Sequence, residues 1–82
     1  MNGRRSNIQI IAEILRLGEA TKTGIMYRVN LSHSQLQKYL DFLVEKRLLE
    51  LVHNSNASIY RTTSKGKALL RDIERLSALL GE

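Results

Sequence analysis

The stretch that decides the fold runs from Asn30 to Leu43 and reads NLSHSQLQKYLDFL. Ser32 and, three positions later, Gln35 form a capping box, which satisfies the backbone amides left without partners where a helix begins. We therefore expect a helix over residues 33–46. Its buried face should consist of Leu36, Tyr39, Leu40, Leu43 and Val44. The opposite face carries small polar side chains, glutamine and lysine, whereas an ordinary surface helix would carry Glu and Lys pairs.

The whole chain has the composition of one small folded domain. It has 82 residues, of which 43% are apolar and 26% are charged, and this composition differs from that of a disordered chain. Thirteen Lys and Arg against eight Asp and Glu give a formal net charge of +5, which favours an anionic partner. Because cysteine is absent, disulfides, thiolate metal sites and cysteine nucleophiles are excluded.

The N-terminal part predicts a helix over residues 7–17, capped by Ser6 and closed by Gly18. Helical spacing gives this helix two apolar sides. One consists of Ile8, Ile11, Ala12 and Leu15, and the other of Ile10, Ile14 and Leu17. Such a helix must be covered from two directions, either by two layers of its own domain or by its own domain and a second copy. Polar residues interrupt the apolar stretch and no cleavage site follows, so we expect no signal peptide and no transmembrane span.

Two further elements flank the helix at 33–46. A helix over residues 22–29 is expected before it, with either Thr21 or Thr23 as the cap. After it, two short runs of strand-forming residues enclose a polar turn, which predicts a β-hairpin over residues 48–62.

The last element is a helix over residues 64–80, capped by Thr63 or Ser64. Its apolar residues are spaced 4, 3 and 4 positions apart, as in a helix–helix seam. The seam consists of Leu69, Ile73, Leu76 and Leu80. It lasts only about two heptads, below the roughly three or four that identify a coiled coil.

The order helix, helix, turn, helix, hairpin, helix predicts a winged helix-turn-helix, a mainly α fold with a small β-hairpin (α+β). The stretches RRSNIQIIAEIL (4–15), ATKTGIMYRVNLSHSQLQKYLDFLVEKRLLE (20–50) and YRTTSKGKALL (60–70) resemble the small archaeal-type winged-helix DNA-binding proteins. This group contains transcriptional regulators and chromatin-associated dimers. The resemblance implies double-stranded DNA as the partner and, in long-tailed members, an antiparallel coiled coil between two C-terminal helices.

In this fold, we expect helix 33–46 to enter the major groove, where short polar side chains near its N-terminus read base edges. Glutamine can pair with adenine through two hydrogen bonds. The hairpin tip would lie along the minor groove or the backbone. The candidate DNA contacts are His33, Ser34, Gln37 and Lys38 on this helix, Lys22 and Thr23 on the preceding one, Asn54, Asn56 and Arg61 on the hairpin, and Arg4 and Arg5 in a basic N-terminal arm.

We also expect a homodimer formed through the first and last helices, since symmetric dimers are the commonest oligomers. The alternative is that the last helix packs only on the first helix of its own chain. The candidate interface residues are Ile10, Ile14, Leu17, Leu69, Ile73, Leu76 and Leu80. Two recognition helices related by a two-fold axis would suit half-sites one helical turn apart.

The sequence predicts no enzyme, metal site, cofactor or small-molecule ligand. Two histidines without cysteine make a poor ligand set, and Ser32, His33 and Asp41 lie on one helix where they cannot converge as a triad.

A protein-interaction module is the alternative function, favoured by the acidic residues Asp41 and Glu45 on the helix face. RNA binding has weaker grounds because aromatic residues are few. We expect a cytoplasmic, nucleoid-associated protein. Within the fold, we expect the Tyr27 side chain to pack against other residues.

Overall fold

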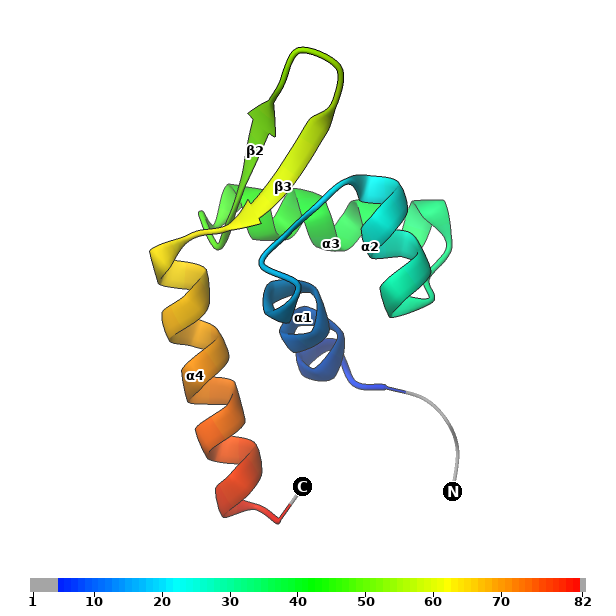
Figure 1. Cartoon of the computed structure of the whole chain (residues 1–82). Helices are drawn as coiled ribbons and strands as arrows, with labels where there is room; N and C mark the ends of the chain where they lie inside the picture. Colours follow the sequence, from blue (N-terminus) through cyan, green and yellow to red (C-terminus); the bar gives the residue numbers. More distant parts are fainter. Residues whose placement is uncertain (1–4, 82) are drawn as a thin grey trace.

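The structure is a computed structural model in which residues 5–81 are described (Figure 1). Its elements are α1 (Asn7–Arg16), β1 (Glu19–Ala20), α2 (Lys22–Val29), α3 (His33–Glu45), β2 (Leu49–His53), β3 (Ser58–Thr62) and α4 (Ser64–Leu79). The helix-turn-helix of α2 and α3 is followed by the hairpin of β2 and β3, so the predicted winged helix-turn-helix is confirmed. The hairpin projects to one side of the molecule, and the far end of α4 points to the other (Figure 1).

Each helix begins at a hydroxyl cap that the local sequence supplies. Ser6 and Ser32 both form complete capping boxes, each with the glutamine three positions later. Thr21 and Thr63 each accept a hydrogen bond from the amide of a glycine three positions later, so the first of the two alternative caps holds for α2 and for α4. Gly18, just after α1, has the left-handed conformation expected of it, with φ +80°.

The sheet has three antiparallel strands in the order β1-β3-β2, one more strand than the sequence predicted. In the short strand β1, Glu19 pairs with Arg61 and Ala20 with Tyr60 of β3. β2 and β3 pair along their whole length, and the backbone amide of Asn54 donates to the carbonyl of Ala57, 2.7 Å away, to close the hairpin loop.

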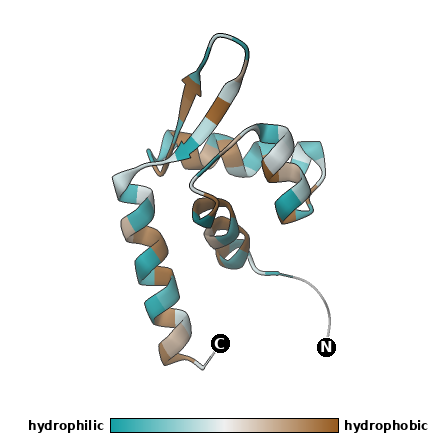
Figure 2. Cartoon of the chain, in the orientation of Figure 1, coloured by the Kyte–Doolittle hydropathy of each residue, from teal (hydrophilic) through white to brown (hydrophobic). Residues whose placement is uncertain are grey.

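The core lies where α1, α2 and α3 meet below the sheet. The fully buried side chains are Ile14, Leu15, Ile25, Val29, Leu36, Leu40 and Leu43. Figure 2 shows apolar colouring around most of α1, in agreement with the sequence pattern. The expectation that Ile10 and Ile14 face a second copy is wrong, because they are only 8% and 2% exposed and belong to the chain's own core. The neighbouring elements of the same domain therefore cover the side of α1 that carries Ile10 and Ile14.

A compact junction fixes the base of the hairpin to α1 and α4. The buried Thr62 hydroxyl donates to the Leu15 carbonyl at 2.9 Å, and the Thr62 amide donates to the Gly18 carbonyl at 2.7 Å. The amide of Thr63 donates to the Leu48 carbonyl at 3.1 Å. These bonds join the end of α1, the start of β2 and the start of α4, so the hairpin is anchored at its base by buried backbone groups.

Candidate nucleic-acid interface

The N-terminal half of α3 presents an outward polar surface. His33, Ser34 and Lys38 are exposed, and Gln37 is half-buried beside them. Ser32 caps the helix, and its Oγ lies 3.5 Å from that of Ser34. Since a buried apolar face holds the opposite side of α3, the fold directs these four side chains away from the core.

Lys22, the first residue of α2, reaches across to this surface. Its Nζ lies 2.8 Å from Nε2 of His33 and also donates to Oε1 of Gln37. An ammonium group can only donate, so Nε2 of His33 must accept in this contact. The sequence placed Lys22 on the DNA backbone; in the structure it is part of the α3 surface. Thr23 lies exposed in the next position.

Acidic residues continue the same face of α3 toward its C-terminus. Nε2 of Gln37 donates to Oδ1 of Asp41 at 2.7 Å. Asp41 and Glu45 are both exposed, so polyanion binding is favoured at the N-terminal half of the helix and opposed at the other half.

The hairpin tip is a second exposed polar surface. Every residue from His53 to Ser58 is exposed, which includes Asn54 and Asn56. Nδ1 of His53 lies 2.9 Å from Oγ of Ser58, a contact that ties the ends of the two strands together. The amide side chains of the tip are therefore available to a ligand without disturbing the sheet.

Arg61, on β3, lies between two carboxylates. Its Nε is 3.7 Å from Glu19 and 3.9 Å from Glu50, and all three side chains are about half exposed. Such exposed pairs contribute little to stability. The two acidic neighbours do, however, offset the positive charge that a phosphate would meet, so Arg61 is a weaker candidate than the sequence indicated.

Arg5, one of the two residues of the predicted basic N-terminal arm, makes contacts within the protein. Arg5 forms an ion pair with Glu13 and donates to the Val29 carbonyl, so its guanidinium is held against α1 and α2. The expectation that Arg5 reaches out to phosphate is therefore wrong for this structure. Arg4 lies outside the described residues.

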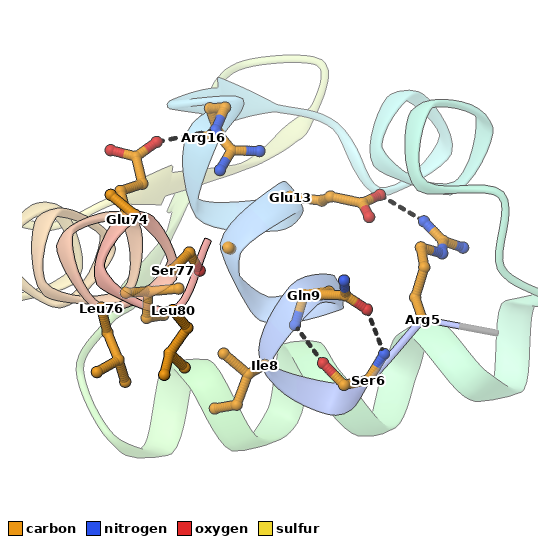
Figure 3. A pocket seen from close by; sticks show the side chains of 13 residues that line it. Arg5, Ser6, Ile8, Gln9, Glu13, Arg16, Glu74, Leu76, Ser77 and Leu80 are labelled. Carbon is orange, nitrogen blue, oxygen red and sulfur yellow. Dashed lines mark hydrogen bonds and ion pairs between the residues drawn. The ribbon is translucent and has the colours of Figure 1, made fainter. Parts of the chain in front are cut away.

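The proposed interface residues on α1 and α4 divide into covered and exposed groups. Leu17 and Leu69 are partly buried against the core, whereas Leu76 and Leu80 are 58% and 65% exposed. Ile8, which lies on the side of α1 that the sequence did not assign to the dimer, is 53% exposed. Together with Leu76 and Leu80 it lines a groove of about 640 Å³ between α1 and α4 (Figure 3).

Salt-bridged side chains border this α1/α4 groove. Nε of Arg16 donates to Glu74 at 3.2 Å across the two helices, and Arg5 with Glu13 lies at the other side (Figure 3). The groove therefore combines an apolar floor with a charged rim, as protein–protein interfaces do.

Among single residues, the exposure of Tyr27 differs most from what the sequence predicted. It is 82% exposed on α2, so the expectation that it packs in the fold is wrong.

Among residues 5–81 no three His, Cys, Asp or Glu side chains are grouped closely enough to hold a metal ion. Within the same range no helix is long and apolar enough to cross a membrane.

Comparison with known proteins agrees with this architecture. A family model described as winged helix-turn-helix matches residues 4–80. Two proteins of Methanocaldococcus jannaschii, both named as uncharacterised, are 32% identical over 80 residues; the matches cover 94% of this chain and 78% and 36% of the relatives.

Solved structures with the same fold come from archaea and bacteria. The crystal structure of Sso10a-2, a DNA-binding protein from Sulfolobus solfataricus, has a TM-score of 0.84 at 30% identity and covers 94% of this chain and 83% of that one. The transcriptional repressor BigR from Xylella fastidiosa has a TM-score of 0.71 at 18% identity, covering 89% and 74% of the two chains, a likeness of fold alone.

Proposed function

Because the chain belongs to the winged helix-turn-helix family, we propose that it binds double-stranded DNA and acts as a transcriptional regulator in the nucleoid. α3 enters the major groove, and the hairpin and basic side chains lie on the DNA backbone. One observation carries this proposal: the polar N-terminal half of α3 and the polar hairpin tip are both exposed, on a protein of net charge +5. The similarity to Sso10a-2, described as DNA-binding, supports it.

A salt titration of duplex binding tests this function. Anisotropy of a labelled duplex should give a dissociation constant that rises with salt, because each neutralised phosphate releases counterions. Lys38→Gln should weaken binding and lower the salt slope by about 1. Arg75→Gln removes the same charge from the far part of α4 and should change both much less. Absence of binding at low salt, or binding that salt does not weaken, would contradict the proposal.

Selection from a random duplex pool separates a regulator from a general DNA-binding protein. An enriched sequence indicates base reading, and an enriched palindrome also indicates a two-fold protein. A pool that emerges without any enriched sequence would instead favour an architectural role through backbone contacts.

The protein acts as a homodimer through the α1/α4 groove. Ile8, Leu76 and Leu80 expose apolar surface there, and surface of this kind is usually covered in solution. A second copy is the partner that fits best, because a two-fold axis would bury the exposed apolar residues of the groove twice.

The test of the dimer is the mass in solution. The chain has a mass of 9.4 kDa, and sedimentation equilibrium should give twice this value. Leu76→Ser should weaken dimerisation at least about tenfold, given about 1.5–3 kcal/mol for a buried leucine. Leu51→Ser is the matched control, since Leu51 is 40% exposed on β2, outside the groove. A wild-type monomer, or equal effects of the two changes, would contradict the dimer.

A protein-interaction module without nucleic-acid binding is the second candidate function. The observation that favours it is the exposed pair Asp41 and Glu45 on α3, since carboxylates repel DNA phosphate. The duplex titration separates the two functions, because this candidate predicts no duplex binding even at low salt.

A further inference from the structure

Gln37 lies between two groups of opposite charge, and this arrangement was not predictable from its place on α3. Its Oε1 accepts from the ammonium of Lys22, and its Nε2 donates to the carboxylate of Asp41 at 2.7 Å. An ammonium only donates and a carboxylate only accepts. The reverse orientation of the amide would place NH₂ against NH₃⁺ and oxygen against carboxylate. The two neighbours therefore fix which end of the amide faces α2.

The fixed amide still has capacity for a ligand. Its oxygen carries two lone pairs and its nitrogen two hydrogens, and the two internal contacts use one of each. One acceptor and one donor remain side by side on the same group. Adenine presents a donor at N6 and an acceptor at N7 in the major groove, which is the complementary pair.

We propose that Asp41 is a positioning residue, which together with Lys22 holds the Gln37 amide in the orientation that reads adenine. This proposal rests on the proposed DNA-binding function and deepens it. Asp41 contacts Gln37 and need not touch DNA. The proposal also explains the presence of an acidic residue on a DNA-facing helix: its negative charge opposes binding to phosphate in general, while its hydrogen bond supports reading of one base.

The competing account is an ordinary helix pair. Gln and Asp at positions i and i+4 stabilise helices slightly in any context. That account predicts a small loss of stability on removing Asp41 and no change in base preference. The position of Lys22 on the opposite end of the amide distinguishes the two, because a helix pair alone has no need of a cation from α2.

Two substitutions separate the hydrogen bond from the charge. Asp41→Asn keeps an acceptor oxygen for Gln37, whereas Asp41→Ala removes it, and both raise the net charge by one. Glu45→Gln also raises the net charge by one, one turn farther along α3. Both positions are exposed, so the three variants should fold, which circular dichroism checks.

The measured quantity is the preference for the sequence enriched by the wild-type protein over the same duplex with its adenine positions changed one by one. Asp41→Ala should lose about tenfold in preference at one adenine, within the range for a bidentate contact. Asp41→Asn and Glu45→Gln should keep the preference within about threefold. All three should bind a scrambled duplex somewhat more tightly, because the added positive charge acts on any sequence.

A measurement without DNA provides an independent readout. In ¹⁵N-labelled protein, the side-chain amide of Gln37 should show the restricted motion of a held group in the wild type and in Asp41→Asn. In Asp41→Ala it should show the fast motion of an exposed side chain.

The outcomes distinguish this inference from the function on which it rests. A wild-type protein that binds no duplex overturns both. Binding with no base preference overturns the reading role of Gln37 while the DNA-binding function stands. An unchanged preference in Asp41→Ala, or an equal loss in Asp41→Asn, overturns the positioning role alone.

Discussion

Gly66 provides the sharpest test of the packing, because α4 passes there directly over the start of β2. A Cβ added to Gly66 would lie 2.2 Å from the carbonyl oxygen of Leu48 and 2.9 Å from Cγ2 of Thr62, and real Cβ contacts are essentially never below 3.0 Å. The same Leu48 carbonyl accepts from the amide of Thr63 at 3.1 Å and from its hydroxyl at 3.2 Å. Gly66→Ala must therefore displace the helix from the group that anchors it.

The magnitude follows from three contributions. Overpacking costs about 2 kcal/mol, and weakening the two hydrogen bonds costs about 1 kcal/mol each. The better helix propensity of alanine returns about 1 kcal/mol. We expect Gly66→Ala to lower the free energy of unfolding by about 3 kcal/mol and the Tm by about 15 °C for a domain of this size.

Gly24→Ala is the matched control. Its added Cβ would meet only Oγ1 of Thr21 at 3.3 Å and Cβ of Ala20 at 3.9 Å, so the change should stay within about 1 kcal/mol of wild type. Thermal unfolding followed by far-ultraviolet circular dichroism measures both variants. A Gly66→Ala protein that melts within about 3 °C of the wild type, less than 1 kcal/mol by the same scaling, would refute the described packing of α4 on β2.

Three other substitutions test separate parts of the structure. Ser32→Ala removes a complete capping box and should cost about 1 kcal/mol of stability in urea unfolding, whereas Ser34→Ala on the same exposed surface should cost much less. Thr62→Val deletes the buried hydroxyl that donates to the end of α1 and should cost about 1–2 kcal/mol, a value that chemical denaturation measures. Arg5→Gln should leave duplex affinity nearly unchanged in the anisotropy assay, unlike Lys38→Gln, because the Arg5 guanidinium is already paired within the protein.

Helix starts were predictable because their signals are local. A cap such as Ser32 and its partner Gln35 are three residues apart, and the hydrogen bonds between them need no tertiary structure. The element order built from these starts was sufficient for the fold class. The bounds of α1, α3 and α4 differ from the prediction by one residue at the C-terminal end, where helices fray.

β1 was not predictable from the sequence, since it depends on a partner far along the chain. Its two residues, Glu19 and Ala20, are too few to show an alternating pattern. They become a strand because Arg61 and Tyr60 of β3 lie beside them. The contact of Lys22 with Gln37 was not predictable for the same reason, because it joins two helices that a turn separates.

Helical spacing gives the width of an apolar surface but not the number of elements that will cover it. Ile10 and Ile14 were assigned to a second copy for this reason, whereas Ile8, which was left out of the interface, is exposed. The position of Tyr27 could have been predicted. It lies two residues from both Ile25 and Val29, the buried pair of α2, and two residues correspond to a rotation of about 200°.

The junction at the base of the hairpin gives the proposed dimer a geometric consequence. Thr62, at the end of β3, donates to the carbonyls of Leu15 and Gly18 at the end of α1. Thr63 donates to the Leu48 carbonyl, which Gly66 of α4 also approaches closely. Since proteins transmit displacements through tightly packed contacts, we expect the hairpin, α3 and the start of α4 to move as one body. If α4 of two copies pair through the α1/α4 groove, the separation of the two α3 helices is set by this junction and not by surface loops. The protein would then select DNA whose half-site spacing matches that separation.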